Sequence, residues 1–367
     1  MRLDHLWVVD FRNYQAAELA LVAGLTVIVG LNGAGKTNLL EAIAYLATLS
    51  SFRGVPNDAL IRAGAGAGGG GAGAVVRGEG VRAGRALLVE VEIRPTGRGR
   101  VTVNRQPVRR TADLNGALRV SVFSPDDLEL VKAGPTGRRR YLDEVLASLH
   151  PRNDAARRDL ERVVRQRNAL LAQAGGRLNL PEDLATTLEV FDARLVQIGE
   201  AIGAARADLV ARLEPAVAKA YAQVAGGGSG VAGVSYDAPW REKGLAAALK
   251  TARRDELRRG VTLVGPHRDE LALTIGAMPA RSHASQGEQR SLALALRLAA
   301  HDVVVELVGE PPLLLLDDVF SELDAGRSDA LLANLPPGQA VLTTAGAVPA
   351  GAHADQVLRI DGGRIVP

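Results

Sequence analysis

The chain has 367 residues, a formal net charge of +3 and no cysteine. This length suggests two domains, and the lack of cysteine excludes disulfides and thiolate metal sites and fits a reducing compartment. The first residues lack the apolar stretch of a signal peptide, and no apolar run approaches the roughly 18–20 residues that span a bilayer. We therefore expect a cytoplasmic protein without a membrane partner.

A phosphate loop is predicted at residues 30–37. The apolar, β-branched run 25–29 is typical of a buried parallel strand, and residues 38–48 favour a helix. The sequence between them fits G-x-x-x-x-G-K-[ST] in full, so its backbone N–H groups can surround a phosphate at a helix N-terminus. A glycine-rich turn without a ligand is the alternative, and the coincidence of strand, motif and helix disfavours it. The predicted nucleotide-binding residues are Gly30, Leu31, Asn32, Gly33, Ala34, Gly35, Lys36, Thr37 and Asn38.

Two side chains of this loop have distinct chemical roles. Lys36 supplies a positive charge to the β- and γ-phosphates and counts as catalytic, and the Thr37 hydroxyl is a magnesium ligand. The sequence therefore predicts ATP and Mg²⁺ as cofactors.

The region around this loop reads as strands and turns up to about residue 135. Residues 87–93 and 100–103 are predicted to form antiparallel strands. Residues 63–74 are almost pure glycine and alanine, so we expect a mobile loop there.

Residues 136–260 are predicted to form a helical lobe with a short antiparallel, coiled-coil-like arm. We expect its main helix to pair with the helix around 160–171, although an ordinary amphipathic core helix would show the same pattern. Residues 225–233 should form a flexible break before the chain returns to the first domain at 261–367. The apolar positions alternate spacings of four and three: Leu184, Leu188, Phe191, Leu195, Ile198, Ile202, Ala205 and Leu209.

Arginines crowd the start of this helical lobe. Such a stripe could neutralise DNA phosphates and make binding salt-dependent, whereas the interspersed acidic residues fit a solvated helix face equally well. Aromatic residues make up only 3% of the chain, which disfavours base stacking and favours contact with a duplex backbone. The candidate DNA contacts are Arg138, Arg139, Arg140, Arg157 and Arg158.

The segment 285–290 carries a serine-glycine turn before a long Leu- and Ala-rich helix. Ser285 with Glu288 three residues later has the form of a capping box, which alone would be the sufficient interpretation. Its position between the phosphate loop and an Asp-Asp strand favours a second role, because an exposed helix N-terminus suits a γ-phosphate. A chain has one such turn for each phosphate loop, so Ser285, Gly287 and Glu288 are predicted to complete the site of a second copy related by a two-fold axis.

The run 311–318 is apolar until it ends in two aspartates, which predicts a central strand covered on both sides. Carboxylates at the carboxyl end of such a strand lie where α/β sheets bind ligands. Asp317 is the predicted magnesium ligand, and Asp318 is predicted to orient or deprotonate the attacking water. Two aspartates that merely cap the next turn are the alternative.

Six segments in this order closely resemble the RecF family, the bacterial recombination-repair relatives of the SMC proteins. The resemblance implies an α/β fold: an ABC-type ATPase head, with a phosphate-loop sheet and an antiparallel β subdomain, plus the helical second lobe. It further implies slow, DNA-dependent ATP hydrolysis and ATP-driven homodimerisation on double-stranded DNA near single-strand gaps and junctions. Cooperation with RecO and RecR in loading RecA, and association with the nucleoid, are also implied. The segments are 11–14, 30–43, 123–143, 265–271, 285–290 and 313–324.

The resemblance also suggests roles for isolated residues. Arg12 would reach the phosphates, and Asp324 would belong to a dimer-facing loop. Asp318 stands where the wider ABC pattern has glutamate, and the strand at 340–344 ends without the histidine of transporter ATPases, so only Thr343 or Thr344 could contact the γ-phosphate there.

Two points stay open in the sequence. His267 is expected to be a hydrogen-bonded structural residue, with Arg268 and Asp269 forming a pair. An ATPase head coupled to a nuclease, or an SMC-like chromosome-organising protein, are the alternative functions; the first needs a second acidic metal cluster and the second a longer arm.

Overall fold

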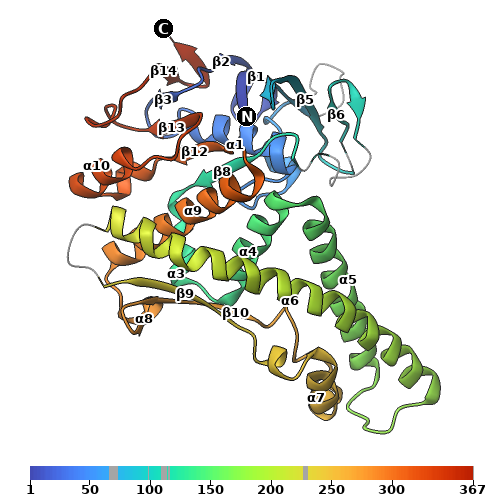
Figure 1. Ribbon diagram of the computed structural model, residues 1–367. Coiled ribbons are helices and arrows are strands. Elements are labelled where there is room, and N and C mark those ends of the chain that lie inside the picture. The colour runs from blue at the N-terminus through green and yellow to red at the C-terminus, as the bar shows by residue number, and fades with distance from the viewer. Residues whose placement is uncertain (66–72, 98, 109–113, 115, 226–229, 367) are drawn as a thin grey trace. The chain divides into compact units, whose positions relative to one another are not determined.

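The computed structural model divides into two compact units, each described here by itself (Figure 1). The first unit comprises Met1–Leu128, Ala216–Val231 and Ser285–Pro367, and the second comprises Glu129–Pro215 and Ala232–Ala284. The structure describes residues 1–65, 73–97, 99–108, 114, 116–225 and 230–366.

This division differs from the expected one in three places. Residues 129–135, expected in the ATPase head, belong to the second unit. Residues 261–284, expected in the ATPase head, belong to the second unit because their strand β10 (Glu270–Ile275) pairs antiparallel with β9 (Ala232–Asp237). Residues 216–231, expected in the helical lobe, belong to the first unit.

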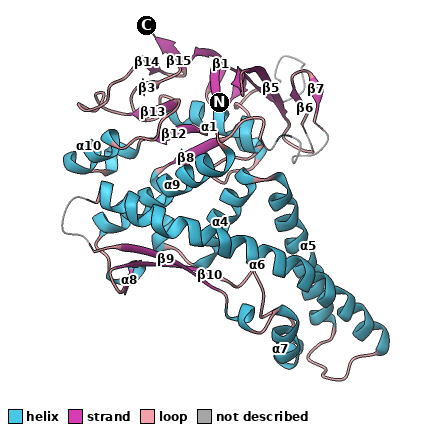
Figure 2. Ribbon diagram, viewed as in Figure 1, coloured by secondary structure: helices cyan, strands magenta, loops and turns pink. Residues whose placement is uncertain are grey.

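A mostly parallel sheet forms the base of the first unit, in the order β15-β14-β3-β13-β12-β8 (strands in magenta, Figure 2). The neighbours β14, β3, β13, β12 and β8 are parallel, and only β15 is antiparallel. Both β12 and β13 are buried along their whole length, which explains their apolar sequences. The strands span Leu25–Val29 (β3), Val120–Phe123 (β8), Leu313–Asp317 (β12), Ala340–Thr344 (β13), Gln356–Asp361 (β14) and Arg364–Val366 (β15).

A second, antiparallel sheet has the order β2-β1-β4-β5-β6-β7. The predicted antiparallel pair is confirmed, since β5 pairs antiparallel with β6. The strands span Arg2–Phe11 (β1), Tyr14–Ala20 (β2), Ala74–Arg82 (β4), Arg85–Ile93 (β5), Val101–Val103 (β6) and Gln106–Pro107 (β7).

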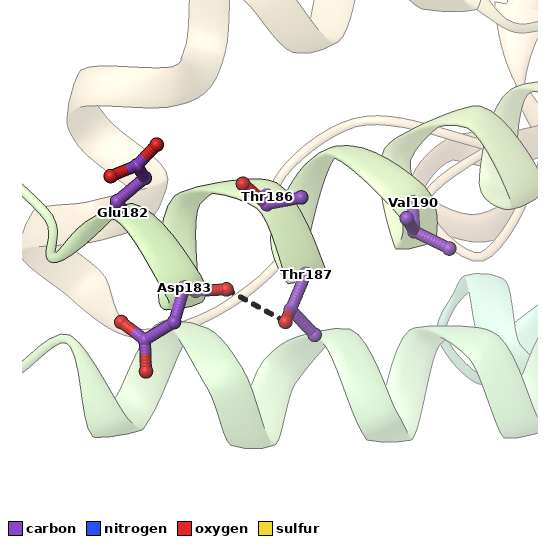
Figure 3. Close-up of a pocket in the computed structure, with 5 residues that line it drawn as sticks. All are labelled: Glu182, Asp183, Thr186, Thr187 and Val190. Carbon is purple, nitrogen blue, oxygen red and sulfur yellow. Dashed lines mark hydrogen bonds between the residues drawn. The ribbon is translucent and has the colours of Figure 1, made fainter.

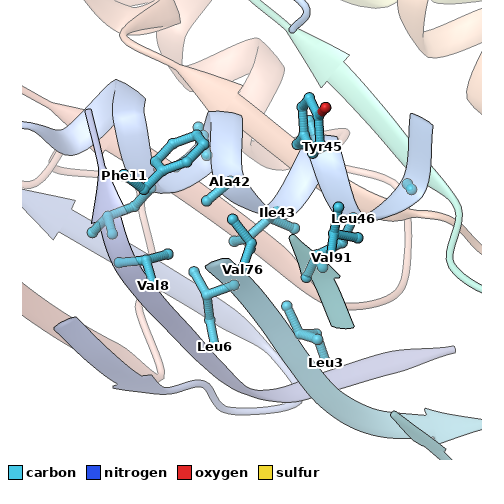
Figure 4. Close-up of a cluster of buried hydrophobic side chains, with 14 of the residues drawn as sticks. Leu3, Leu6, Val8, Phe11, Ala42, Ile43, Tyr45, Leu46, Val76 and Val91 are labelled. Atoms are coloured by element: carbon cyan, nitrogen blue, oxygen red, sulfur yellow. The ribbon is translucent and has the colours of Figure 1, made fainter. Parts of the chain in front are cut away.

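Helix α1 (Lys36–Thr48) contacts both sheets of the first unit. A single apolar core therefore extends over both sides of the helix. Figure 4 shows Ile43 and Leu46 of α1 beside Leu6 of β1, Val76 of β4 and Val91 of β5. The burial of nearly every residue from Leu39 to Ala47 fixes this helix, and with it the loop that precedes it. The unit also contains η1 (Asn57–Leu60), η2 (Pro125–Leu128), α9 (Gln286–Val308), η4 (Val319–Glu322) and α10 (Ala325–Ala333).

The second unit is mainly helical and carries a small sheet of order β11-β10-β9. Helix α6 is the longest element, and its last residues, beyond Pro215, belong to the first unit. The elements are α3 (Glu129–Lys132), α4 (Pro135–Leu149), α5 (Pro151–Gln173), α6 (Glu182–Val224), η3 (Pro239–Glu242), α7 (Leu245–Arg259), β11 (Met278–Pro279) and α8 (Ala280–His283).

The predicted apolar seam of α6 is buried against α5, as expected. Leu195 and Ile198 pack in one cluster with Leu160 of α5. The same cluster contains Leu245 of α7 and Trp240, and a further one joins α6 to Leu257 of α7. The arm therefore contains a third helix, α7, in addition to the two helices that the sequence predicted.

Two expected flexible segments fall partly outside the described residues. Of the glycine-alanine stretch 63–74, residues 66–72 are not described, and of the break at 225–233, residues 226–229 are not described. Among the helices that the structure describes, none has the length and apolar character needed to cross a membrane.

Candidate nucleotide-binding site

The phosphate loop connects β3 to α1, as the motif predicts. Gly33 and Gly35 have φ values of 82° and 113°, a region that side chains other than glycine rarely adopt. The Nζ of Lys36 donates to the carbonyls of Gly30 at 2.7 Å and Leu31 at 3.0 Å, so the loop closes around its own lysine. Burial lowers the pKa of Lys36, and the nearby Asp318 and Asp317 oppose that shift. The ammonium group is thus partly desolvated, and its hydrogen bonds to the described residues go to carbonyls.

The turn between β1 and β2 holds the phosphate loop from the other side. Asn13 Nδ2 donates to the Ala34 carbonyl at 3.0 Å, and the buried Tyr14 hydroxyl donates to the Gly35 carbonyl at 3.0 Å. Asn38 Nδ2 donates in turn to Asn13 Oδ1 at 2.8 Å. A Cβ on Gly35 would stand only 2.5 Å from Asn13 Nδ2, so this glycine is required by contact as well as by backbone conformation. The sequence did not predict that Asn13 and Tyr14 support the phosphate loop, because residues 11–14 stood out only as one segment of the family resemblance.

Asp317 lies at the end of β12 between two threonine hydroxyls. Its Oδ1 accepts hydrogen bonds from Thr37 Oγ1 at 2.8 Å and from Thr343 Oγ1 at 2.9 Å. Burial raises the pKa of Asp317, Asp318 adds to that shift, and the two threonine hydrogen bonds oppose it.

This donor set fits a hard divalent cation. Six-coordinate Mg²⁺ takes oxygen ligands at about 2.1 Å, which puts neighbouring ligands roughly 3 Å apart. The 2.8 Å between Thr37 Oγ1 and Asp317 Oδ1 matches that separation. Thr37 and Asp317 are therefore the residues that could hold the ion predicted from the sequence.

Asp318 begins the turn after β12 with an unusual backbone. Its φ is 48° and its ψ is 29°, in the left-handed region, and its N–H donates to Thr343 Oγ1 at 2.9 Å. The alternative of a capping aspartate is wrong for Asp318, because its side chain makes no capping hydrogen bond to η4. A non-glycine residue held in this conformation is a feature of functional sites.

Arg12 does not point into the phosphate loop. Its guanidinium forms a two-pronged pair with Glu41 of α1, with Nε–Oε2 at 2.7 Å and Nη2–Oε1 at 2.8 Å, and Nη1 donates to the Ala59 carbonyl. Glu41 is fully buried. The expectation that Arg12 reaches the phosphates is therefore corrected: a buried carboxylate needs this arginine, which joins the β1–β2 turn to α1.

Arg53 is a cation near the site that the sequence did not suggest. It follows α1 in an exposed turn, where its N–H donates to Ser51 Oγ at 3.1 Å. Burial raises the pKa of Asp317, and the charge of Arg53 opposes that rise, which places Arg53 within electrostatic range of the predicted magnesium ligand. No pattern marks it, because a single arginine in a polar loop has no periodicity or spacing.

The turn at residues 285–288, here the signature turn, forms the predicted capping box at the start of α9. Ser285 N–H donates to Glu288 Oε2 at 2.8 Å, and Glu288 N–H donates to Ser285 Oγ at 3.3 Å. Ser285 is exposed, so its hydroxyl is accessible. Asp324 caps α10 by accepting from Arg327 N–H at 2.9 Å. Both elements belong to the same unit as the phosphate loop.

The candidate DNA-contact arginines need correction. Arg138 is only 6% exposed and forms a two-pronged pair with Glu270, at 2.7 and 2.8 Å. Arg139 donates to the Asp269 carbonyl at 2.8 Å. Arg138 and Arg139 are thus structural in the second unit, because Glu270 is the first residue of β10 and Asp269 directly precedes it.

The two candidates on α5 are engaged with acidic neighbours on the same helix. Arg157 pairs with Asp154 and Glu161, and Arg158 pairs with Asp154. This matches the alternative of a solvated helix face. Arg140 is exposed and remains a candidate.

The Gly-Pro-His-Arg-Asp segment is a packing element of the second unit. His267 lies within hydrogen-bonding distance of the Thr262 carbonyl, Nε2 to O 3.2 Å, and burial lowers its pKa to about 4, so the structural expectation is confirmed. The expected Arg268–Asp269 pair is wrong. Arg268 donates to the Thr262 carbonyl, and Asp269 accepts from Tyr236 and Trp240.

A surface hollow of about 780 Å³ lies elsewhere, at the start of α6 (Figure 3). Its lining residues all come from one helix, and none belongs to the motifs above: Glu182, Asp183, Thr186, Thr187 and Val190. Within the described part of the chain, no group of three or more histidines and acidic residues could hold a metal by itself. The second acidic metal cluster that the nuclease alternative needs is thus not found among the described residues.

Comparison with known proteins identifies the family of the chain. The family model described as RecF/RecN/SMC N terminal domain matches residues 2–341. Proteins named DNA replication and repair protein RecF are 44% identical in Kineococcus radiotolerans, over 97% of both chains, and 46% identical in Frankia alni, over 94% of this chain and 93% of that one.

The fold is shared with solved structures of the same name. A structure of the recombination mediator protein RecF-ATPrS in RecFOR pathway is 29% identical, with a TM-score of 0.87 over 99% of this chain and 97% of that one. An Smc head domain from Pyrococcus furiosus, 16% identical with a TM-score of 0.58 over 99% of this chain and 95% of that one, shares the fold alone. The predicted ATPase-head fold is thus confirmed, and the chain belongs to the RecF family.

Proposed function

We propose that this chain is a slow, DNA-dependent ATPase of recombinational repair that binds duplex DNA as an ATP-driven homodimer. The observation that carries the proposal is the Thr37–Asp317–Thr343 cluster beside a complete phosphate loop. The similar protein whose structure is named RecF-ATP in RecFOR pathway supports ATP as the ligand.

The residues of the phosphate loop bind and orient the triphosphate. Lys36 exchanges its two carbonyl partners for phosphate oxygens, and the partly desolvated ammonium is a strong donor to them. Thr37 and Asp317 would hold Mg²⁺, which when bound would neutralise charge on the β- and γ-phosphates. Thr343 keeps the Asp317 carboxylate oriented by its hydrogen bond, at 2.9 Å.

The signature turn is proposed to complete the site of a second copy. Its exposed Ser285 hydroxyl and the N-terminus of α9 suit the oxygens of a γ-phosphate. Since each chain has one phosphate loop and one signature turn, two nucleotides would join two copies about a two-fold axis.

Asp318 is proposed to position the attacking water. Its backbone is fixed by the hydrogen bond from its N–H to Thr343, which also binds Asp317. Phosphoryl transfer depends mainly on positioning and electrostatics, so no covalent intermediate is expected. The aspartate at this position fits a slow timer for release from DNA.

Duplex DNA near single-strand gaps and junctions is the proposed substrate surface, with RecO and RecR as partners in loading the recombinase at the nucleoid. Membership of the family and the RecFOR name of the similar structures support this step. Among the arginines of α4 and α5, we propose the exposed Arg140, Arg152 and Arg165 as phosphate contacts.

The dimer is tested by Ser285→Arg in sedimentation experiments with ATP and with a non-hydrolysable analogue. The bulky cation should block closure, so the wild type should dimerise with nucleotide and the variant should remain monomeric while still binding ATP. Ser235→Arg, at an exposed serine of β9, is the matched control. A Ser285→Arg protein that dimerises like the wild type would refute the role of the signature turn.

DNA binding is tested with gapped, duplex and single-stranded DNA across a salt series, each with and without nucleotide. We expect tightest binding to gapped duplex with ATP, and a steep loss of affinity with salt. Weak binding that ignores nucleotide would contradict the proposal.

A further inference from the structure

The guanidinium group of Arg327 in α10 lies against the glycine of the signature turn. A Cβ built on Gly287 would stand 2.7 Å from Nη1, 2.9 Å from Nη2 and 3.1 Å from Cζ of Arg327. Nη1 and Nη2 are both nearer to that position than Cζ, so the edge of the group formed by the two Nη atoms faces the glycine. A side chain at position 287 would displace it, so the contact depends on glycine.

The guanidinium is held in this place by Asp324. Nη1 of Arg327 pairs with Asp324 Oδ2 at 2.8 Å, and the N–H of Arg327 donates to Asp324 Oδ1 at 2.9 Å. One carboxylate therefore caps α10 and orients the side chain three residues later. Nε of Arg327 is buried and has no hydrogen-bond partner among the described residues. The fold therefore holds the guanidinium in a position where one of its donors, Nε, has no partner among the described residues.

The charge of Arg327 also reaches the capping box. The hydrogen bonds from Ser285 lower the pKa of Glu288, and Arg327 adds to the same shift. Glu288 in turn accepts from the N–H and the hydroxyl of Ser285, at 2.8 and 2.7 Å. A continuous series of contacts thus runs from Asp324 through Arg327 to Gly287, Glu288 and Ser285.

We propose that Arg327 is a positioning residue that holds the signature turn in shape and couples it to the nucleotide site of its own chain. This rests on the proposed cross-copy role of the signature turn. Asp318 at the end of β12 is followed by η4 (Val319–Glu322), and η4 leads directly to Asp324. A displacement at Asp318 is passed through Asp324 and Arg327 to the turn that serves the other copy, so occupancy of one site alters the second.

Replacing the arginine of an ordinary surface ion pair should not have the effect that we expect at Arg327. Arg258 and Asp255 of α7 have the same residue types and the same spacing, and they are exposed. Such pairs contribute little. What distinguishes Arg327 is the contact of its two Nη atoms with Gly287, which the single ammonium of lysine cannot reproduce although it keeps the charge.

The first experiment compares Arg327→Lys with Arg258→Lys as the matched control. Arg327→Lys should require about tenfold more protein for half-dimerisation in ATP, and amides 285–289 of the ATP-free monomer should exchange hydrogen about tenfold faster. Nucleotide affinity of the monomer should stay within about twofold, because the phosphate loop is untouched. Arg258→Lys should match the wild type in every measurement.

The second experiment is a double-mutant cycle of Gly287→Ala and Arg327→Ala. If the guanidinium is what the new methyl group meets, the double variant should dimerise like Arg327→Ala alone. Effects that multiply in the double variant would show that Gly287 acts independently of Arg327 and would overturn the proposal.

The outcomes separate the two proposals. If the wild type stays monomeric with ATP, the proposed function fails, while the exchange rates of the signature turn still decide the role of Arg327. If the wild type dimerises and Arg327→Lys leaves both dimerisation and exchange unchanged, Arg327 is an ordinary surface residue and only this inference fails.

Discussion

Two polar clusters, one in each unit, differ in how their charged side chains are paired. In the second unit, Arg167 is fully buried and gives each of its three donor groups a partner: Nε to Asp192 at 2.6 Å, Nη1 to Thr262 at 2.9 Å and Nη2 to Glu256 at 2.6 Å. Glu256 is fully buried too, and its other oxygen accepts from Leu263 N–H. This cluster is complete by itself.

In the candidate nucleotide site of the first unit, the charged side chains are not paired with one another in this way. Two carboxylates, Asp317 and Asp318, are neighbours of like charge, and Lys36 donates to carbonyls instead of a carboxylate. The pKa of Asp317 is raised and that of Lys36 is lowered, so both groups are held away from their preferred charged state. An incoming cation would relieve the first and an incoming phosphate the second, which supports our proposal that this cluster binds the nucleotide and its metal ion.

The largest expected effect is in the complete cluster. Arg167→Met leaves Glu256 buried without its counter-charge, so the free energy of unfolding should fall by about 3–5 kcal/mol in urea titrations. Arg165→Met, at an exposed position on the same helix, is the control and should stay within about 0.5 kcal/mol. A small change for Arg167→Met would mean that the two clusters do not differ as described.

A smaller effect concerns His301 in the first unit, which is 1% exposed and whose pKa burial lowers to about 4. Between the unfolded pKa of about 6.5 and the folded value, the unfolded chain binds more protons, so stability falls as pH falls through this window. His301→Gln should remove up to about 3 kcal/mol of that loss, measured as unfolding free energy between pH 7 and pH 4. His353→Gln, at an exposed histidine, should leave the slope unchanged.

The smallest effect is on binding alone. Lys36→Met should weaken ATP binding roughly a hundredfold, about 2.7 kcal/mol, in calorimetry, because a charged donor to phosphate is lost. Stability should not fall, since the pKa of Lys36 shows that its charge is disfavoured by burial. Lys250→Met, on the exposed face of α7, is the control. Strong destabilisation by Lys36→Met would show that the lysine is structural, like Arg167.

The sequence predicted the parts of the site that are contiguous in the chain. The phosphate loop, the Asp-Asp strand and the capping box at Ser285 each depend on neighbours within a few residues, so local spacing was sufficient. The apolar period of α6 likewise predicted a buried seam.

Contacts between distant residues could not be predicted in this way. Arg138 looked like a DNA contact because its partner Glu270 lies 132 positions further on. Thr343 binds Asp317 only because β12 and β13 are paired in register, and Arg327 meets Gly287 only because α10 lies against the start of α9. Nothing in the local pattern around Arg12 distinguished a phosphate ligand from the partner of buried Glu41.

The left-handed backbone of Asp318 has a consequence for the choice of amino acid at that position. Aspartate and asparagine adopt this conformation more readily than longer side chains, because a short polar group can bond locally. A glutamate introduced there would gain reach but would be strained in its main chain. The backbone conformation at this position thus favours the shorter acid over glutamate, independently of the distance that its carboxylate would have to span.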